Sequence, residues 1–547
     1  MPSLTATSIP PKTGWAGLMQ NWRADALSGF LVFLIALPLC LGIAMASGFP
    51  PMGGIISAIV GGILVSRLNG SFVTINGPAA GLIVVVLGAV QSLGQGDAMA
   101  GYRYTLAAIV VASVLQTLMG LCKAGRLSAF FPASVVHGML AAIGIIIMAK
   151  QIHVMLGVKP EAQELIETIL AIPDSVLNLN PEIAIIGFVG LGLLITWSLI
   201  KSPLLKMIPA PLLVVAVGMA LERWFDLDHE HVYMFLPDQA FLPHHEFTIG
   251  PRFLVSIPDD FLSGFYFPDF GKIATLEFWT AVVSICLVGS LESLLSAAAV
   301  DKLDTCKRYS DLNRDLAAVG IGNVICGLLG GLPMIAEIVR SSANVNNGAK
   351  TGWANFFHGT FLLVFVAVFP HVIHEIPLAS LAALLVYTGF RLASPREFAK
   401  TMEIGWEQLS LFVITIIGIL ATDLLIGVFI GIAAKFVLHL LRGVSVGNLF
   451  KIFYTVDEKA DGGYVVKIEG SAVFSNFIAL KSAIAELPEG KQVLFDLSET
   501  YLIDHTVMEF VDHYCHDYQA RGGVCVIQGL DNHKAYSSHP LAARKRV

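Results

Sequence analysis

The chain contains few charged residues for its length. Of its 547 residues, 14% are Asp, Glu, Lys or Arg and 55% are hydrophobic, whereas about 25% are charged in a typical soluble domain. With a mean hydropathy of +0.73, this composition excludes an ordinary soluble globular protein. The formal net charge of −7 provides no basic surface, so we expect no nucleic acid among the partners.

Paired cysteines and targeting signals are also missing. The seven cysteines are scattered and none forms a CxxC pair, which argues against a metal site and against a disulfide framework. Residues 1–14 are polar and no small-residue cleavage site follows the first apolar run, so the sequence shows no cleavable signal peptide. The apolar portion holds no nucleophile with a base and an orienting group, so we expect neither an enzyme nor a bound cofactor.

Long apolar runs, in contrast, are abundant. Runs of about 20 residues, enough to cross about 30 Å of hydrocarbon, recur from Leu27 to Leu441. They predict an α-helical polytopic membrane protein with fourteen segments as seven plus seven: repeat one at about 25–222, an outer loop at 223–272 and repeat two at about 275–442. The predicted segments are 27–47, 52–68, 78–93, 102–121, 129–152, 182–200, 208–222, 275–299, 312–331, 335–348, 352–370, 377–392, 407–420 and 423–442.

The distribution of lysine and arginine predicts the orientation in the membrane. With residues 1–24 as a cytoplasmic N-terminal segment, the inner connections are rich in basic residues and the outer ones are poor, and the long outer loop is acidic. The basic residues expected on the inner side include Arg67, Lys123, Lys302, Arg308 and Lys350. An even number of segments returns the C-terminus to the cytoplasm, so we expect both termini there.

After Leu441 the pattern of the sequence changes. Strand candidates lie at 464–468, 493–497 and 524–527, and helical patterns lie at about 476–487 and 505–520. Strands that alternate with helices within about 100 residues predict a small cytoplasmic α/β domain at 450–547, following a transmembrane domain at 25–445.

Two short segments with a proline occupy corresponding places in the two halves. They are Asn76–Ala80 and Gly331–Glu337, and each precedes a segment too short for a full crossing. Short or interrupted segments at matched positions indicate the binding site of an inverted-repeat transporter. The alternative is that Pro78 and Pro333 only kink their helices, which transmembrane helices tolerate.

Each of these segments is predicted to begin a helix inside the membrane. Such a helix has unpaired N–H groups and about half a positive charge at its start. Pro78 fits the first helical turn, and Gly77 allows close approach of a ligand. The N–H groups expected to donate to one anion near the midplane are those of Ala79, Ala80, Ala336, Glu337 and Ile338.

Three parts of the chain resemble the SulP family of anion permeases. Asp25–Gly29 with Ala36–Ala44 resembles the signature of the family's first span, and Gly289–Ser296 resembles its eighth span. Asp496–Ser498 with Ile503–Thr506 resembles the core of its C-terminal STAS domain. The parts stand in the family's order over nearly the whole chain.

This resemblance implies a fold, an activity and further site residues. Members of the family are sulfate permeases, bicarbonate transporters and anion exchangers, with fourteen segments in two inverted repeats divided into core and gate domains, and they are commonly dimers. By the same resemblance, Pro38, Leu39 and Cys40 lie beside the substrate. Thr506 corresponds to a position phosphorylated in some STAS domains, although we favour a role in assembly or regulation without a phosphate switch.

Arg340 and Glu292 are the two charged residues expected to act in transport. A guanidinium at membrane depth is costly, so Arg340 either binds the anion or forms a structural ion pair with Glu337, three residues before it. Glu292 and Ser296 share one helix face and can ligate Na⁺, or the carboxylate can carry H⁺; a structural salt bridge is the alternative for Glu292. No other metal ligands are expected.

The residues and the resemblance together predict cation-coupled uptake of a small inorganic anion in a bacterial cytoplasmic membrane. We favour bicarbonate, because the Glu292 face resembles the bicarbonate transporters, with sulfate next and a dicarboxylate as a further alternative. Two other classes stay open, a nucleobase permease and a STAS-based membrane sensor. Expected partners are the anion, membrane lipid, a second copy of the chain and a cytoplasmic protein bound by the STAS domain.

Overall fold

The chain divides into two compact units. One unit comprises Met1–Gly125 and Ile143–Arg391, and the other comprises Arg126–Ala142 and Leu392–Val547. The computed structural model describes residues 11–125, 131–159, 165–200, 208–234, 246–258, 260–306, 308–460, 462–488, 490–520 and 522–547.

Helices occupy most of the predicted apolar segments. In the first half they are α1 (Gly14–Ala46), α2 (Pro51–Val60), a π-helical turn (Gly61–Val65), α3 (Ser66–Leu68), α4 (Ile83–Gly94), α5 (Ala98–Leu121), α6 (Ala133–Met155), α7 (Leu165–Leu170), α8 (Ile172–Leu177), α9 (Pro181–Leu199) and α10 (Ala210–Phe225). In the second half they are α11 (Leu276–Leu303), α12 (Leu312–Leu329), α13 (Ile338–Asn346), α14 (Trp353–Val368), α15 (Pro370–His374), α16 (Leu378–Leu392), α17 (Pro395–Ile404), α18 (Trp406–Ala421) and α19 (Leu424–Leu441). The two segments expected to start as helices near Pro78 and Ala336 start as strands instead.

The length and composition of these helices make the chain an integral membrane protein. Within the described residues, nine helical stretches have at least 18 residues and are apolar enough to cross a membrane, where α2 to α3 (Pro51–Leu68) and α16 to α17 (Leu378–Ile404) each count as one stretch. Three shorter apolar helices accompany them, at Ala80–Gly94, Trp353–Val368 and Trp406–Ala421. Many membrane-crossing helices were predicted, and the structure confirms that expectation.

The first helix is longer than predicted. It begins at Gly14, well before the apolar run that starts at Leu27. Its first turns expose Trp15, Met19 and Trp22, which are 75%, 80% and 50% accessible. Exposed tryptophans are typical of the membrane interface, so we expect these first turns, which fall within the predicted N-terminal segment, to lie at that interface.

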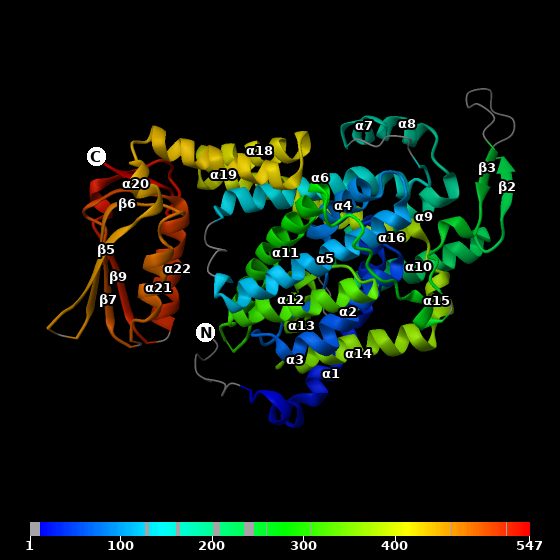
Figure 1. Ribbon diagram of the computed structural model, residues 1–547, viewed down its shortest axis with the longest axis horizontal. Coiled ribbons are helices and arrows are strands. Elements are labelled where there is room, and N and C mark those ends of the chain that lie inside the picture. The colour runs from blue at the N-terminus through cyan, green and yellow to red at the C-terminus, as the bar shows by residue number, and fades with distance from the viewer. Residues whose placement is uncertain are drawn as a thin grey trace. The chain divides into compact units, whose positions relative to one another are not determined.

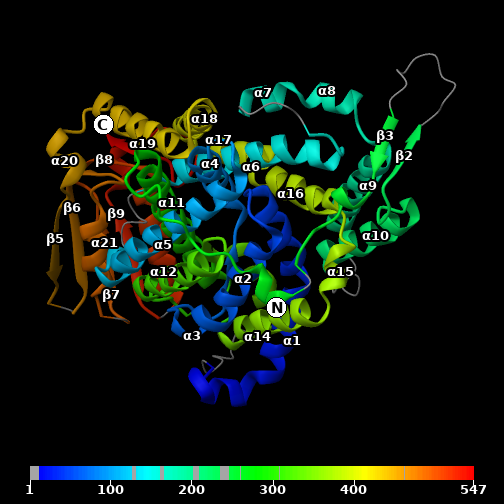
Figure 2. The same cartoon turned by 45° about the vertical axis from the view of Figure 1, so that its right-hand side comes forward.

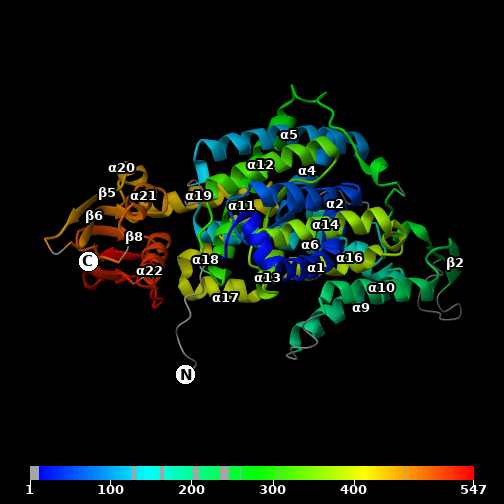
Figure 3. The same cartoon turned by 90° about the horizontal axis from the view of Figure 1, so that it is seen from below.

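Glycine allows the helices of the first unit to approach closely. Helix α1 lies beside α14, and α5 lies beside α12 (Figure 3). A Cβ atom at Gly29 would lie 2.6 Å from the Ala354 carbonyl oxygen, and one at Gly120 would lie 2.5 Å from the Ala317 nitrogen. Small residues at helix contacts are the usual means of packing helices in a membrane.

Two pairs of short strands lie among the helices of the first unit. Strand β1 (Ile75–Pro78) pairs with β4 (Met334–Glu337), and β2 (His231–Met234) pairs with β3 (Glu246–Ile249). Both pairs are antiparallel. The β2–β3 pair belongs to the acidic loop between the two halves (Figure 2), whereas the β1–β4 pair joins the two halves themselves.

The predicted C-terminal α/β domain is present. Its strands are β5 (Phe453–Glu458), β6 (Tyr464–Ala472), β7 (Gln492–Asp496), β8 (Thr500–Ile503), β9 (Val524–Gln528), β10 (His533–Ala535) and β11 (Arg544–Arg546), in the order β10-β11-β8-β6-β7-β9 with β5 against β6. Helices α21 (Ile478–Ala485) and α22 (His505–Ala520) lie on one face of this sheet (Figure 1), where Leu480 and Val507 pack with Val466 and Phe495. The three predicted strands and two predicted helices are confirmed.

The expectation of no disulfide is wrong for one pair of cysteines. Cys515 in α22 and Cys525 in β9 are joined, with their Cα atoms 5.1 Å apart. Spacing alone does not reveal this pair, because it forms only when α22 packs back against the strand that follows it.

Candidate functional site

The two segments predicted to meet at the site are paired residue by residue. In the antiparallel register Ile75 faces Glu337, Gly77 faces Ile335, and Pro78 faces Met334. The two segments are more than 250 residues apart in the sequence and come from opposite halves. The structure therefore brings both predicted segments to one place, as a two-stranded ribbon.

The local structure of the ribbon differs from the prediction that Pro78 occupies a first helical turn. Pro78 ends strand β1, and Ala79 is also extended, with φ −122° and ψ 148°. Residues Ala80–Leu82 form a 3₁₀ turn before α4 starts at Ile83. The extended form is favoured because two short segments in a membrane can satisfy their backbone groups by pairing with each other.

Side chains from neighbouring helices hold the ribbon in place. The Asn323 amide in α12 donates to the Met334 carbonyl at 2.9 Å and accepts from the Met334 N–H at 2.6 Å. The Ser341 hydroxyl in α13 accepts from the Ile75 N–H at 2.8 Å and donates to the Glu337 carbonyl at 2.6 Å. Each strand therefore has partners outside the ribbon as well as inside it.

Arg340 is buried against the end of β1. Its side chain is 1% exposed, and Nη2 donates to the Pro78 carbonyl at 2.6 Å. Its Nη1 donates to Cys40 Sγ at 3.4 Å, and its Nε has no hydrogen-bond partner among the described residues. A Cβ atom at Gly77 would lie 2.6 Å from Nη1, so glycine is required for the guanidinium to sit here. The site thus holds a fixed positive charge with one donor unused.

Glu337 occupies the start of α13. Its carboxylate accepts from the Arg340 N–H at 2.7 Å, and Oε2 lies 4.0 Å from Arg340 Nε. The side chain is 16% exposed. The Glu337 side chain thus caps the first turn of α13 at the Arg340 N–H. The expectation that the N–H groups of Glu337 and Ile338 face the anion stays a prediction. The Arg340–Glu337 ion pair predicted as the alternative is also present at this longer distance.

The predicted donor Ala336 is likewise paired within the chain. Its N–H donates to the Ser293 hydroxyl in α11 at 3.2 Å. Ser293 therefore links α11 to the ribbon, and the partly buried Ser296 is not the hydroxyl that makes this contact. The sequence favours Ser296 because it shares a helix face with Glu292. In the structure, α11 is rotated so that Ser293, the residue directly after Glu292, points at β4.

Glu292 lies against the residues that begin α4. Its side chain is 6% exposed, and Oε1 has no hydrogen-bond partner among the described residues. A Cβ atom at Gly81 would overlap its carboxylate group. The carboxylate of α11 thus approaches the start of the third predicted segment, as Arg340 approaches the end of β1. An unpaired buried carboxylate of this kind suits a proton or a small cation.

Of the three α1 residues implied by the resemblance, Cys40 touches the site directly. Cys40 is fully buried and accepts from Arg340. Pro38 lies inside α1 and is buried, and it removes one backbone hydrogen bond from that helix. Leu39 is half-buried.

Two buried residues near the site escaped the sequence analysis. The Asn355 amide in α14 donates to Asn76 Oδ1 at 3.1 Å, which anchors β1 from a third helix. His358, one turn further along α14, is fully buried, and neither ring nitrogen has a hydrogen-bond partner among the described residues. Polar residues on an otherwise apolar helix are the signal that could have identified both.

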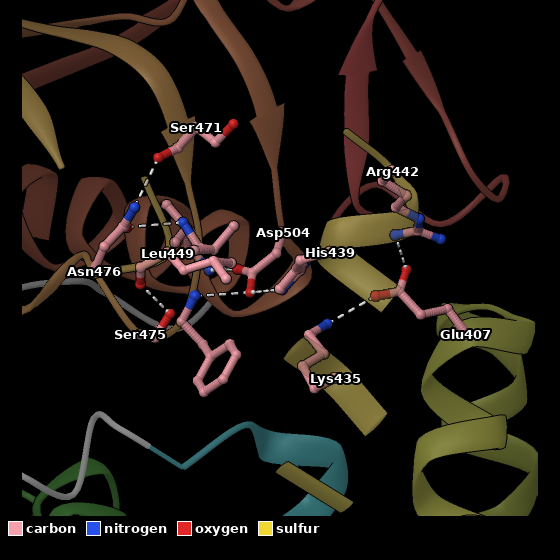
Figure 4. Close-up of polar contacts among 12 residues, drawn as sticks. Glu407, Lys435, His439, Arg442, Leu449, Ser471, Ser475, Asn476 and Asp504 are labelled. Carbon is pink, nitrogen blue, oxygen red and sulfur yellow. Dashed lines mark hydrogen bonds and ion pairs between the residues drawn. The ribbon is translucent and has the colours of Figure 1, made fainter. Parts of the chain in front are cut away.

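A second cluster of charges lies at the end of α19, in the other unit (Figure 4). Lys435 Nζ lies 2.7 Å from Glu407 Oε1, and Arg442 Nη1 lies 2.6 Å from Glu407 Oε2. His439 Nε2 lies 3.5 Å from Asp504 Oδ2, with both side chains fully buried. Burial raises the pKa of Asp504, but the interactions with His439 and with the charge of Lys435 outweigh it and bring this pKa to about 2. The last apolar helix is thereby fastened to the α/β domain.

Thr506 is the second residue of α22. It is half-buried, and it follows Asp504, whose carboxylate accepts from the Val507 N–H at 2.9 Å. The proposed regulatory role of Thr506 stays a prediction.

Comparisons with known proteins agree with the fold described above. The family model described as the sulfate permease family matches residues 22–417. Among curated proteins, YvdB of Bacillus subtilis (strain 168), which carries the name of a sulfate transporter, is 25% identical over 94% of this chain and 92% of its own length. The names of these relatives are those of transporters and not of enzymes, in agreement with the sequence-based expectation.

Two solved structures share the fold. The transmembrane domain of the cyanobacterial bicarbonate transporter BicA aligns with a TM-score of 0.61 at 22% identity, over 76% of this chain and 98% of that one. The murine anion transporter Slc26a9, in an inward-facing state, aligns with a TM-score of 0.61 at 15% identity, over 92% of this chain and 85% of that one. The second alignment extends over most of this chain.

Proposed function

Because the chain belongs to the sulfate permease family, we propose that it is a secondary active transporter of a small inorganic anion. Its helices then form fourteen segments in two inverted repeats of seven, divided into a core and a gate domain. Support comes from the β1–β4 ribbon, which pairs equivalent segments of the two halves.

Arg340 is the observation that carries this proposal. A fully buried guanidinium between the ribbon and α1, with its Nε unused, is a costly feature in a membrane and is explained by a need for positive charge at the site. A planar guanidinium also suits oxyanions, because its N–H groups can donate to two oxygens at once.

The proposed substrate is bicarbonate, with sulfate as the second candidate and a dicarboxylate as the third. An inside-negative potential opposes anion entry by about 2.3 kcal/mol per charge per 100 mV, so a doubly charged sulfate meets twice the opposition that bicarbonate does. The site contains one arginine together with the carboxylates of Glu292 and Glu337, which favours an anion of lower charge. The name of BicA adds support for bicarbonate, and that of YvdB for sulfate.

Glu292 is the proposed coupling residue. Its buried carboxylate can accept H⁺ directly, or bind Na⁺ with oxygens of nearby groups. Ser293 replaces Ser296 as the favoured hydroxyl for this role. It follows Glu292 in α11, and its hydroxyl already accepts a hydrogen bond from Ala336 in β4. When H⁺ or Na⁺ neutralises Glu292, a negative charge beside the incoming anion is removed. Binding of the cation therefore favours binding of the anion, which couples the two.

Glu337 is proposed to act as an internal competitor of the substrate. It holds the helix start that the anion is expected to reach, and it lies within ionic distance of Arg340. An entering oxyanion would take over the interaction with Arg340 as the Glu337 side chain moves aside. The anion and the ribbon would then cross the membrane together, in an elevator-like motion of the core against the gate.

The remaining assignments concern the surroundings of the transporter. We propose a bacterial cytoplasmic membrane, with both termini in the cytoplasm, a homodimer, and a STAS domain at 450–547 that binds a cytoplasmic protein. The basic residues of the inner connections support this orientation.

Uptake into proteoliposomes tests the proposal. Labelled bicarbonate, sulfate, succinate and uracil are compared, each with and without Na⁺ and with and without an imposed pH gradient. We expect bicarbonate uptake that requires one of the two cations. Uptake of uracil alone would identify a nucleobase permease, and absence of any uptake would leave only the sensor.

Two variants test the assigned residues in the same assay. Glu292→Gln should remove the cation dependence, whereas Glu277→Gln, in the exposed first turn of the same helix, should keep it. Arg340→Ala should raise the half-saturating anion concentration about tenfold or more, because a charge-assisted hydrogen bond contributes about 1.5–3 kcal/mol. Arg103→Ala, an exposed arginine that donates to the Phe267 carbonyl, is the matched control.

A further inference from the structure

A cavity lined by arginines lies apart from the ribbon, among connections that the basic residues place on the inner side. Its volume is about 580 Å³, and its walls come from the start of α1, the α3–β1 connection, the α11–α12 connection and the α13–α14 connection. The side chains that matter are Arg67, Arg308, Arg314, Trp15, Phe72 and Trp353. The transport site described above uses none of them.

Arg67 is held as a rigid donor at one wall. Its Nη2 donates to the Gly352 carbonyl at 2.7 Å and its Nε donates to the Ser66 hydroxyl at 3.2 Å. The guanidinium carbon lies 3.7 Å from the centre of the Trp353 ring. Stacking on an aromatic ring fixes the plane of a guanidinium while leaving its edge available.

Arg308 supplies a buried donor, Nη1, that finds no acceptor in the described part of the chain. Its side chain is 9% exposed, with Nε and Nη2 donating to Asp304 at 2.7 and 3.1 Å. Its Nη1 is buried and has no hydrogen-bond partner among the described residues. The guanidinium carbon lies 4.6 Å from the centre of the Phe72 ring, so this group is also stacked. A buried unpaired donor on a charged group is costly and points to a missing acceptor.

The carboxylates around the cavity are already engaged. Asp311 accepts from the Asn313 and Arg314 N–H groups at 3.1 Å as the cap of α12. Asp304 is paired with Arg308, which lowers the pKa of Asp304 although burial opposes that change. Among the lining residues three arginines stand against the carboxylate of Asp311. Arg314, whose Nε donates to the Leu68 carbonyl at 2.9 Å, is exposed at the rim of the cavity.

We propose that this cavity binds a phosphate group, either in the headgroup of an anionic lipid or in a soluble phosphate ester. Arginines with fixed planes are the side chains best suited to hold phosphate oxygens through paired hydrogen bonds. Trp15 at the mouth is 75% exposed, and aromatic residues at this depth mark the membrane interface where headgroups lie. The bound phosphate would connect the inner ends of α1, α3, α12 and α14.

Native mass spectrometry of the full-length protein in detergent tests the lipid source, with phosphatidylglycerol as the probe and phosphatidylcholine as the neutral control. Thermal stability with and without inorganic phosphate tests the soluble source. We expect selective retention of phosphatidylglycerol, stabilisation by inorganic phosphate, or both, and the pattern identifies which source the cavity accepts.

Variants connect any binding to this cavity. Arg67→Gln should weaken it about tenfold, which is 1.4 kcal/mol, while Arg23→Gln, an exposed arginine of α1 outside the cavity, should not change it. Arg308→Lys keeps a positive partner for Asp304 and should weaken binding similarly without unfolding the chain. Binding unaltered by both cavity variants, or no response to either probe, would overturn the proposal.

Discussion

Gly81→Ala is expected to displace the Glu292 carboxylate. A Cβ atom at residue 81 would lie within 3.0 Å of both carboxylate oxygens, a separation that real Cβ contacts do not show. Residue 81 lies in a 3₁₀ turn without a positive φ, so the alanine backbone itself is unstrained. The whole cost therefore comes from overlap in a buried place, where an inserted methyl group typically costs about 1–3 kcal/mol.

A double-mutant cycle isolates that overlap. Glu292→Ala alone removes a buried carboxylate with an unpaired oxygen and should change stability little. In the double variant, Gly81→Ala with Glu292→Ala, the overlap is gone. Most of the roughly 1–3 kcal/mol of stability lost in Gly81→Ala should therefore be regained, and this appears as a coupling energy between the two positions. Gly88→Ala in α4 is the control, because nothing lies within 4 Å of a Cβ atom there.

The assay is thermal unfolding in detergent at one fixed scan rate, followed by cation-dependent uptake in proteoliposomes. Gly81→Ala should unfold several degrees below the wild type and lose cation dependence, and the double variant should regain the stability but not the coupling. If the double variant is as unstable as Gly81→Ala alone, Glu292 does not lie against residue 81 and the coupling site is misplaced.

Three further predictions concern other buried polar groups. Asn323→Ala should destabilise the chain by about 1–3 kcal/mol in thermal unfolding, because both polar groups of Met334 lose their partner. Glu407→Gln should cost about 3–5 kcal/mol by the same measurement, since it leaves the buried Lys435 without its counter-charge. Asp504→Asn should cost about 2 kcal/mol at neutral pH. The pKa of this carboxyl group is about 2 in the folded chain against 3.8 in the unfolded chain, so its stabilising contribution is complete above the unfolded pKa and is lost as the pH falls towards 2. The difference in unfolding free energy from the wild type should therefore be constant between about pH 5 and 8 and shrink below about pH 4. An unfolding difference for Asp504→Asn that grows as the pH falls would contradict that sign.

The helices and the α/β domain could be predicted because their signals are local. Apolar runs identify helices wherever hydropathy alone decides, and the alternation at 464–468 identifies β6 within a larger sheet. Strand β5 was missed although Phe453–Glu458 also alternates partly, because its polar residues resemble a linker. Local patterns thus found β6, β7 and β9 and missed β5, β8, β10 and β11. Of the missed strands, β8 and β11 lie inside the sheet and are only four and three residues long.

The candidate site was predicted in its location but not in its conformation. Four residues such as Met334–Glu337 carry no strand period, and their extended form depends on a partner from the other half. The capping role of Glu337 was missed because Ser, Thr, Asp and Asn are the usual caps. Ser293 was missed because helical spacing predicts which residues share a helix face, but it does not predict how that helix is rotated against its neighbours.

The pairing of β1 with β4 also bears on how the chain is made. Pro78 emerges from the ribosome 256 residues before Met334, its partner in the ribbon. At about 5–20 residues per second, Ile75–Pro78 waits roughly 13–50 s for the strand that will satisfy its backbone groups. Lipid offers no hydrogen bonds during that delay. The nascent first half must therefore keep this segment in contact with water or with the insertion machinery until the second half arrives.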